Sequence, residues 1–249
     1  MGLTCSASKS GYFDKQEQAH YKKLLTEEVK KSALRPRRQP PLCTDDPSSG
    51  RMLGKGNSTV LQAYDSNNDQ LIAVKLIKVS GMPADAFDEI EREARLLATL
   101  SHEKIVTYYG SKREDGYLKI YMEYVDGGSL LTLLRSTQPF AEPIAARFTR
   151  QILEGLEYLH SHNIIHRDIK CANVLVDRHG AIKLADFGCA KEALSVLQSY
   201  YGTSGWVAPE VRKKRGYNFF ADIWSLGCTV YEMLVGYSPF AKPGTTEVG

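Results

Sequence analysis

The feature of this sequence that most limits its fold is a run of short β-like segments that stops at the turn "DGGS". The segments "TVLQAYD" (59–65) and "LIAVKLIKV" (71–79) are rich in strand-forming residues and are separated by "SNND", a turn typical of a hairpin. Two further segments, "IVTYYGS" (105–111) and "YLKIYMEYV" (117–125), have the same character. The pattern predicts a small sheet in the first half of the chain.

Helical patterns account for most of the remainder. From Ala84 to Leu100 apolar residues recur at helical spacing, namely at Phe87, Ile90, Ala94, Leu97 and Leu100. After "DGGS", the stretches 143–162 ("PIAARFTRQILEGLEYLHSH") and 222–236 ("DIWSLGCTVYEMLVG") also read as helices. A small β-rich half followed by a larger helical half predicts an α+β fold in two lobes. Ligands favour the cleft between such lobes.

The composition excludes several classes of protein. No run of about 18 apolar residues occurs, so we expect no helix that spans a membrane. The cysteines are widely spread without a CxxC pair, which suits a reduced cytosolic protein and argues against a disulfide framework or a zinc site. The net charge of +3 arises in residues 1–38, which hold nine Lys or Arg and four Asp or Glu. The remaining body is slightly acidic and gives no sign of nucleic-acid binding.

Residues 1–47 are predicted to be a basic, largely disordered tether. At the start of the chain, Gly2 and Ser6 match the G-x-x-x-[ST] pattern of N-myristoylation, and Cys5 is placed for palmitoylation. One myristoyl chain binds membranes only marginally, so Cys5 and the basic residues would supply a second signal. We therefore expect a peripheral protein on the cytoplasmic face of a membrane. An ordinary solvated N-terminus is the alternative.

Four short motifs follow one another along the chain. They are "AVK" ending at Lys75, "HRDIKCANVLV" (166–176), "DFG" starting at Asp186, and "APE" (208–210). Each motif alone would carry little weight, but the ordered set at these spacings resembles the eukaryotic serine/threonine protein kinase family over roughly residues 48 to 240. Together with "MEYVDGGSL" and "GTSGWVAPEV", the set looks most like the MAP kinase kinase kinase branch.

The resemblance implies a bilobal kinase domain over residues 48–249. Its N-lobe would cover 48–122, its hinge 123–126 and its C-lobe 127–249. In this family the fold continues with further helices, and it supplies there an arginine that pairs with the glutamate of "APE", here Glu210. We therefore expect the C-lobe of this chain to be truncated.

The resemblance also implies a catalytic set and a substrate class. Lys75 would hold the α- and β-phosphates of ATP and be oriented by an ion pair with Glu93. Asp168 would orient the attacking hydroxyl and accept its proton, and Lys170 would neutralise the γ-phosphate. Lys170 within "HRDIKCAN" is typical of serine/threonine kinases. Protein substrates are implied, with a downstream MAP kinase kinase as the candidate.

ATP and Mg²⁺ are the implied cosubstrate and cofactor. Asn173 and Asp186 would carry the magnesium ions, which prefer oxygen ligands. Backbone groups of Glu123 and Val125 would hydrogen-bond the adenine, and Met122 would line the back of its pocket. The residues expected around ATP are Leu53, Gly54, Lys55, Gly56, Asn57, Ser58, Val60, Ala73, Lys75, Met122, Glu123, Val125 and Leu175.

The glycine-rich segment "LGKGNSTV" (53–60) is one residue shorter than the GxGxxGxV of the family. Gly54 and Gly56 still allow backbone N–H groups to approach phosphates, and Val60 would still cover the adenine. We expect a working but shortened loop, and a surface turn is the alternative. A pseudoenzyme or scaffold that binds nucleotide or partners without catalysis is the alternative function.

The segment from Asp186 to Glu210 is expected to be regulatory. Arg167 precedes the catalytic aspartate, and a buried guanidinium at this place calls for an anion. Phosphorylation would supply one and would order the segment. By position the candidates are Ser199 first, with Ser195 and Thr203 as further hydroxyls.

Overall fold

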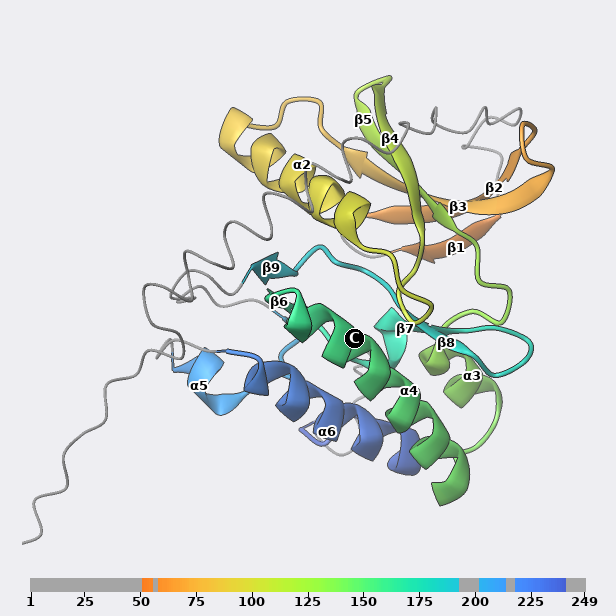
Figure 1. The fold of residues 1–249 in the computed structure, drawn as a ribbon, viewed down its shortest axis with the longest axis vertical. Coiled ribbons are helices and arrows are strands. Elements are labelled where there is room, and N and C mark those ends of the chain that lie inside the picture. Colours follow the sequence, from red (N-terminus) through yellow and green to blue (C-terminus); the bar gives the residue numbers. More distant parts are fainter. Residues whose placement is uncertain (1–50, 56–57, 193–201, 214–217, 241–249) are drawn as a thin grey trace, which may run out of the picture. The chain divides into compact units, whose positions relative to one another are not determined.

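The computed structural model describes residues 51–55, 58–192, 202–213 and 218–240, and Figure 1 shows their fold. A β-rich N-terminal half is followed by a mainly helical C-terminal half, which confirms the α+β, two-lobed fold predicted from the sequence. No helix within the described ranges combines the length and the hydropathy that crossing a bilayer requires.

The described strands of the N-terminal half form one antiparallel sheet in the order β1-β2-β3-β5-β4. They are β1 (Met52–Lys55), β2 (Thr59–Asp65), β3 (Gln70–Lys78), β4 (Tyr108–Glu114) and β5 (Tyr117–Glu123). Strands β2 and β3 form the predicted hairpin. In its turn, the Asp65 carboxylate accepts hydrogen bonds from the Asn67 N–H at 3.0 Å and from the Asn68 side-chain amide at 2.6 Å. Such side-chain to backbone bonds favour a turn over continued strand.

Helix α2 (Ala84–Thr99) is the amphipathic helix predicted from the apolar spacing. Buried Ala94 packs with residues of the sheet and of the loop that enters the helix, namely Val79, Leu118 and Ile120, and Phe87 and Ile90 lie against the same cluster. Leu97 and Leu100, at the end of the helical pattern, belong instead to the core of the C-terminal half. The helix therefore contributes apolar side chains to both halves.

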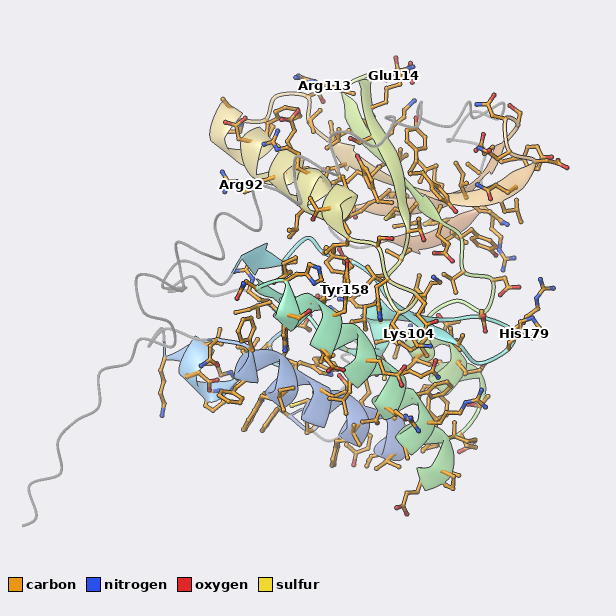
Figure 2. The ribbon with its side chains drawn as sticks, in the orientation of Figure 1. Arg92, Lys104, Arg113, Glu114, Tyr158 and His179 are labelled. Atoms are coloured by element: carbon orange, nitrogen blue, oxygen red, sulfur yellow. The ribbon has the colours of Figure 1, made fainter. Side chains whose placement is uncertain are left out.

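Residues 105–107 differ from the prediction, because β4 begins only at Tyr108. Ile105 forms a parallel bridge with Leu184 of β8 (Ile182–Leu184), and the Val106 N–H donates to the Leu184 carbonyl at 3.0 Å. The Leu184 N–H donates in turn to the carbonyl of Lys104, a residue labelled in Figure 2. An apolar pattern predicts burial but not the partner strand, and here the partner belongs to the other half of the chain.

The C-terminal half is built on α3 (Leu130–Ser136), α4 (Glu142–Ser161) and α6 (Phe220–Val235). The last two are the long helices predicted from the sequence. Ile152 and Leu156 of α4 and Met233 of α6 are buried in one apolar cluster. Helix α3 has a hydrogen-bonded N-cap, because the Ser129 hydroxyl accepts the Thr132 N–H at 3.1 Å.

Short elements lie between α4 and α6 in sequence and carry the motifs. They are β6 (Ile164–Ile165), the 3-10 turn η2 (Cys171–Asn173), β7 (Val174–Val176), β8, β9 (Lys191–Glu192) and α5 (Pro209–Arg212). Strand β6 pairs with β9, and β7 pairs with β8. These elements are too short to give a periodic signal, so the sequence reveals them only through their motifs.

Candidate active site

The loop between β6 and η2 is attached to α6 by a buried carboxylate. Asp222 is fully buried, and its two oxygens accept the backbone N–H groups of His166 at 2.9 Å and Arg167 at 2.8 Å. The ring nitrogen Nε2 of His160 lies 2.8 Å from the same carboxylate. A carboxylate with this many donors fixes the backbone just before Asp168.

Two residues of this region hold unusual backbone conformations. Arg167 has φ of 69° and Asp186 has φ of 58°. A left-handed conformation of a non-glycine residue costs about 1–3 kcal/mol, so the surroundings must enforce it. For Arg167 the hydrogen bond to Asp222 does so, and the buried guanidinium donates from Nε to the Cys189 carbonyl.

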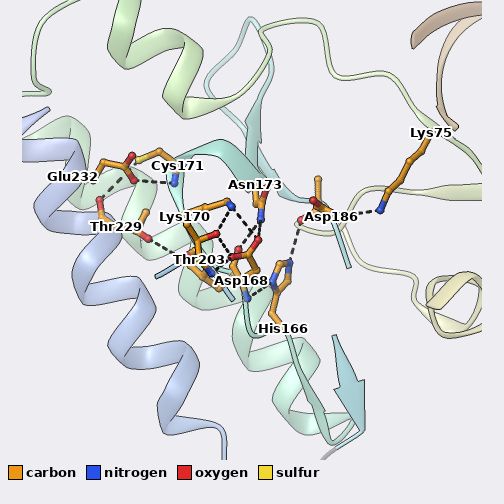
Figure 3. A network of polar contacts seen from close by, with 12 residues as sticks. Lys75, His166, Asp168, Lys170, Cys171, Asn173, Asp186, Thr203, Thr229 and Glu232 are labelled. Atoms are coloured by element: carbon orange, nitrogen blue, oxygen red, sulfur yellow. Dashed lines mark hydrogen bonds and ion pairs between the residues drawn. The ribbon is translucent and has the colours of Figure 1, made fainter. Parts of the chain in front are cut away.

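Asp168 is buried at the centre of a polar cluster (Figure 3). The amide nitrogen Nδ2 of Asn173 donates to Asp168 Oδ2 and to the Asp168 carbonyl, each at 2.8 Å. The ammonium group of Lys170 lies 3.1 Å from Oδ2. The other oxygen, Oδ1, accepts the Thr203 N–H at 3.1 Å and the Thr203 hydroxyl at 2.8 Å. Lys170 also donates to the Thr203 hydroxyl oxygen.

Lys75 of β3 reaches Asp186, 111 residues away in sequence, with Nζ 3.0 Å from Oδ1 (Figure 3). Partial burial would raise the pKa of the Asp186 carboxyl, but the charge and the hydrogen bond of Lys75 outweigh that effect and lower it. The carboxylate is therefore ionised at neutral pH. About half of its side chain is exposed (51%), so it remains open to a ligand.

The strand register brings predicted ATP-binding residues together in rows across the sheet. Gly54 of β1 is paired with Val60 of β2, and Val60 is paired with Lys75 of β3. Two residues earlier on β3, Ala73 is paired with Met122 of β5. Leu53 lies in β1 and is exposed, and Leu175 lies in β7, where it bridges to Ser129.

The turn between β1 and β2 is short. Lys55 is paired with Thr59, so three residues of the sequence separate these paired positions, and two of them, Gly56 and Asn57, lie outside the described ranges. A bulge in β1 between Met52 and Gly54 is the other irregularity of this pair. A connection of this length contains fewer backbone N–H groups than the GxGxxGxV pattern, which is one residue longer.

Glu123, the last residue of β5, bonds to neighbouring segments through its side chain. Its Oε2 accepts the Thr107 N–H at 3.1 Å and the Thr107 hydroxyl at 2.8 Å, and Lys183 of β8 lies 3.1 Å away. The Glu123 N–H donates to the Thr107 carbonyl at 2.8 Å. Within the described ranges the Val125 N–H has no backbone partner, so it is available to an acceptor such as adenine.

A pocket of about 410 Å³ lies against residues 123–126 and the turn between β7 and β8, where His179 is labelled in Figure 2. It is lined by Leu71, Glu123, Tyr124, Val125, Asp126, Asp177, Arg178, His179, Ala181 and Lys183. Because neither Lys75 nor Asp168 nor Asp186 lines it, this pocket is distinct from the polar cluster of Figure 3.

The oxygen donors of the cluster fit a magnesium ion. Both hydrogen bonds of the Asn173 amide use its nitrogen, so its Oδ1 has no hydrogen-bond partner in the described part of the chain. The half-exposed Asp186 carboxylate is a second hard ligand.

Some predicted residues lie outside the described ranges. They are Gly2 and Cys5, the candidate phosphorylation sites Ser195 and Ser199, the loop residues Gly56 and Asn57, and the side chains of Lys55 and Glu93. The ion pair between Lys75 and Glu93 therefore stays a prediction. Ser58 is described and half-buried.

The sequence placed Asp222 on a helix, but its role in holding the loop before Asp168 was not predicted. The available signal was an aspartate within an otherwise apolar helical stretch, because a buried carboxylate requires partners. The role of Thr203 beside Asp168 was missed as well, since the two residues lie 35 positions apart.

Comparisons with known proteins agree with this geometry. The family model described as "Protein kinase domain" matches residues 48–248. Mitogen-activated protein kinase kinase kinase ANP1 of Arabidopsis thaliana is 44% identical over 205 residues, which cover 78% of this chain and 31% of the relative. Mitogen-activated protein kinase kinase kinase 1b of Physcomitrium patens is 46% identical over 200 residues, covering 78% of this chain and 26% of the relative. This chain thus spans about a third or less of the length of these relatives.

Proposed function

This chain belongs to the protein kinase family, and from that membership we propose that it transfers the γ-phosphate of ATP to serine and threonine hydroxyls of protein substrates. One observation carries the proposal. Lys170, Asn173 and Thr203, which come from two separate segments, surround the Asp168 carboxylate within 3.1 Å, a geometry suited to a group that must be held in one orientation.

Asp168 is the proton acceptor in this proposal. As the substrate hydroxyl oxygen bonds to the γ-phosphorus, its proton passes to the Asp168 carboxylate. The bond from the γ-phosphorus to the bridging oxygen breaks, and the electron pair leaves with ADP. Lys170 stands 3.1 Å from the carboxylate, where its positive charge would also meet the transferring phosphoryl group.

Lys75, Asn173 and Asp186 would hold the nucleotide. Lys75 supplies a cation for the phosphates, and its contact with Asp186 brings the sheet and the loop after β8 to the same place. The Asn173 Oδ1 and the Asp186 carboxylate supply the oxygen ligands for Mg²⁺. When bound, Mg²⁺ neutralises charge on the β- and γ-phosphates.

A MAP kinase kinase is the proposed substrate class. The support is the similarity to relatives named as MAP kinase kinase kinases, at 42 to 46% identity over about 200 residues. Transfer to a purified MAP kinase kinase, compared with a generic basic protein at equal concentration, would measure this preference.

The first test uses two substitutions with different expected effects. Lys75→Met should abolish transfer and weaken nucleotide binding, because it removes the cation that meets the phosphates. Asp168→Asn should abolish transfer and leave nucleotide affinity largely intact, because Asp168 acts on the substrate hydroxyl. Phosphate incorporation and fluorescent-nucleotide titration measure the two effects. Transfer that survives in the Asp168→Asn variant would remove the catalytic assignment.

A nucleotide-binding pseudoenzyme is the second candidate, and the short turn between β1 and β2 favours it. A site with fewer N–H groups for the phosphates can bind nucleotide without holding the γ-phosphate for transfer. Nucleotide binding by the wild-type chain without phosphate incorporation into any protein would favour this candidate over the kinase.

A further inference from the structure

The turn η2 needs a hydrogen-bond acceptor from outside itself. The first N–H groups of any helical turn have no partner within the turn. In η2 the N-cap residue is Lys170, and its side chain makes no capping hydrogen bond. A lysine ammonium group can donate hydrogen bonds but cannot accept one, and the Lys170 ammonium is directed to Asp168 and Thr203. The acceptor must come from another element.

Glu232 of α6 supplies it. Its Oε2 lies 3.1 Å from the backbone nitrogen of Cys171, the first residue of η2 (Figure 3). Only 2% of Glu232 is exposed. One turn earlier on α6, the Thr229 hydroxyl donates to the Ile169 carbonyl at 3.2 Å. The same helix therefore contacts the loop on both sides of Lys170.

Retaining a carboxylate at this buried place opposes folding. Burial raises the pKa of Glu232, and the hydrogen bonds from Cys171 offset this only in part. A folded-state pKa above the unfolded value means that this group contributes stability only at low pH and loses it as the pH rises. Near neutral pH a neutral side chain that keeps an oxygen acceptor for the Cys171 N–H would be at least as stable there, so the charge of Glu232 is not needed for stability.

We propose that Glu232 is a positioning residue for phosphoryl transfer, which caps η2 and thereby fixes Lys170 and Asn173 against Asp168. The proposal rests on the proposed kinase function. Lys170 directly precedes the capped N–H, and its carbonyl accepts the Asn173 N–H at 2.9 Å. Both side chains bind the same oxygen of Asp168, so a shift of the backbone at Cys171 moves two of its donors together.

The experiment compares variants of the full chain. Glu232→Gln keeps an oxygen acceptor and removes the charge, whereas Glu232→Met has similar length and no acceptor. We expect kcat of the Gln variant within about threefold of wild type and kcat of the Met variant at least about tenfold lower. KM for ATP should change less than kcat in both, since Glu232 acts on two donors of Asp168 but on only one of the three residues proposed to hold the nucleotide. Glu157→Met, at an exposed position of α4, is the matched control.

Amide hydrogen exchange gives a readout that does not depend on activity. Peptides covering residues 166–173 should exchange faster in Glu232→Met than in wild type or Glu232→Gln, while peptides from α4 stay unchanged. The Tm of Glu232→Gln near neutral pH should equal or exceed that of wild type.

Three outcomes would overturn the inference. They are wild-type kcat and exchange in Glu232→Met, a tenfold loss of kcat in Glu232→Gln, and a parallel loss of Tm and kcat in both variants, which would indicate a structural role. If Glu232→Met does not fold, the kcat, amide exchange and Tm of Glu232→Gln still test the inference against the values expected above. If wild type transfers no phosphate but the exchange pattern is as expected, the cap stands and the proposed kinase function fails.

Discussion

Thr203 donates its hydroxyl to the carboxylate that is proposed to accept the substrate proton. Its backbone N–H binds the same Oδ1, and Lys170 donates to the hydroxyl oxygen. Removing the hydroxyl leaves Oδ1 with one donor fewer and Lys170 with one acceptor fewer. At the scale of single residues, Thr203 therefore acts on the orientation of Asp168.

Thr203→Val should lower kcat by about tenfold or more, because a hydrogen bond to a charged group is worth about 1.5–3 kcal/mol. Valine has the same shape and keeps the backbone N–H, so the fold and the nucleotide affinity should remain. Steady-state kinetics and nucleotide titration measure the two effects. Thr203→Ser, which keeps the hydroxyl, is the control, and equal activity of the Val and Ser variants would contradict the assignment.

At the scale of elements, the connection from the hinge to α3 runs against β7 without room for a side chain. A Cβ added to Gly127 would lie 2.3 Å from the Val176 carbonyl oxygen and 3.1 Å from its carbon. The adjacent Gly128 carbonyl accepts the Val176 N–H at 2.8 Å, so the two backbones are held together. The clash is with backbone atoms and no rotamer change can relieve it.

Gly127→Ala should therefore destabilise the fold by about 1–3 kcal/mol, the usual cost of overpacking. For a domain of this size the Tm should fall by roughly 2–4 °C per kcal/mol. Gly227→Ala is the matched control, because it lies within α6, where an added Cβ meets nothing within 4 Å. That variant should gain about 0.5–1 kcal/mol from helix propensity. Thermal unfolding that shows equal shifts for both variants would contradict the close approach at Gly127.

At the scale of the whole molecule, we propose that residues 1–47 attach the kinase domain to the cytoplasmic face of a membrane. The support is the acylation pattern at Gly2 with Cys5 beside it, followed by a segment with an excess of basic residues. Gly2→Ala should release the protein into the soluble fraction, and Cys5→Ser should weaken its retention, since one acyl chain binds only marginally. Cell fractionation measures both, and unchanged partitioning of Gly2→Ala would sink the proposal.

Local patterns in the sequence were sufficient to predict the long helices and the β2–β3 hairpin. The β2–β3 hairpin, α2, α4 and α6 all follow from spacing and turn residues, because a half-buried strand or helix must repeat its apolar residues with the period of its backbone. The motifs around Asp168 and Asp186 were readable for a similar reason, since each chemical role requires one residue type at a fixed offset.

Only the tertiary structure decided which distant groups meet. Lys75 touches Asp186 and Thr203 touches Asp168, and Ile105 joins β8 although its own segment reads as part of β4. The capping of η2 by Glu232 has no counterpart in any local pattern, because the two segments lie about 60 residues apart. Periodicity specifies that a face is buried, whereas the partner of that face depends on how all elements pack at once. The sequence by itself therefore determined the elements and the candidate chemistry of this protein, and packing determined the geometry that lets the residues act together.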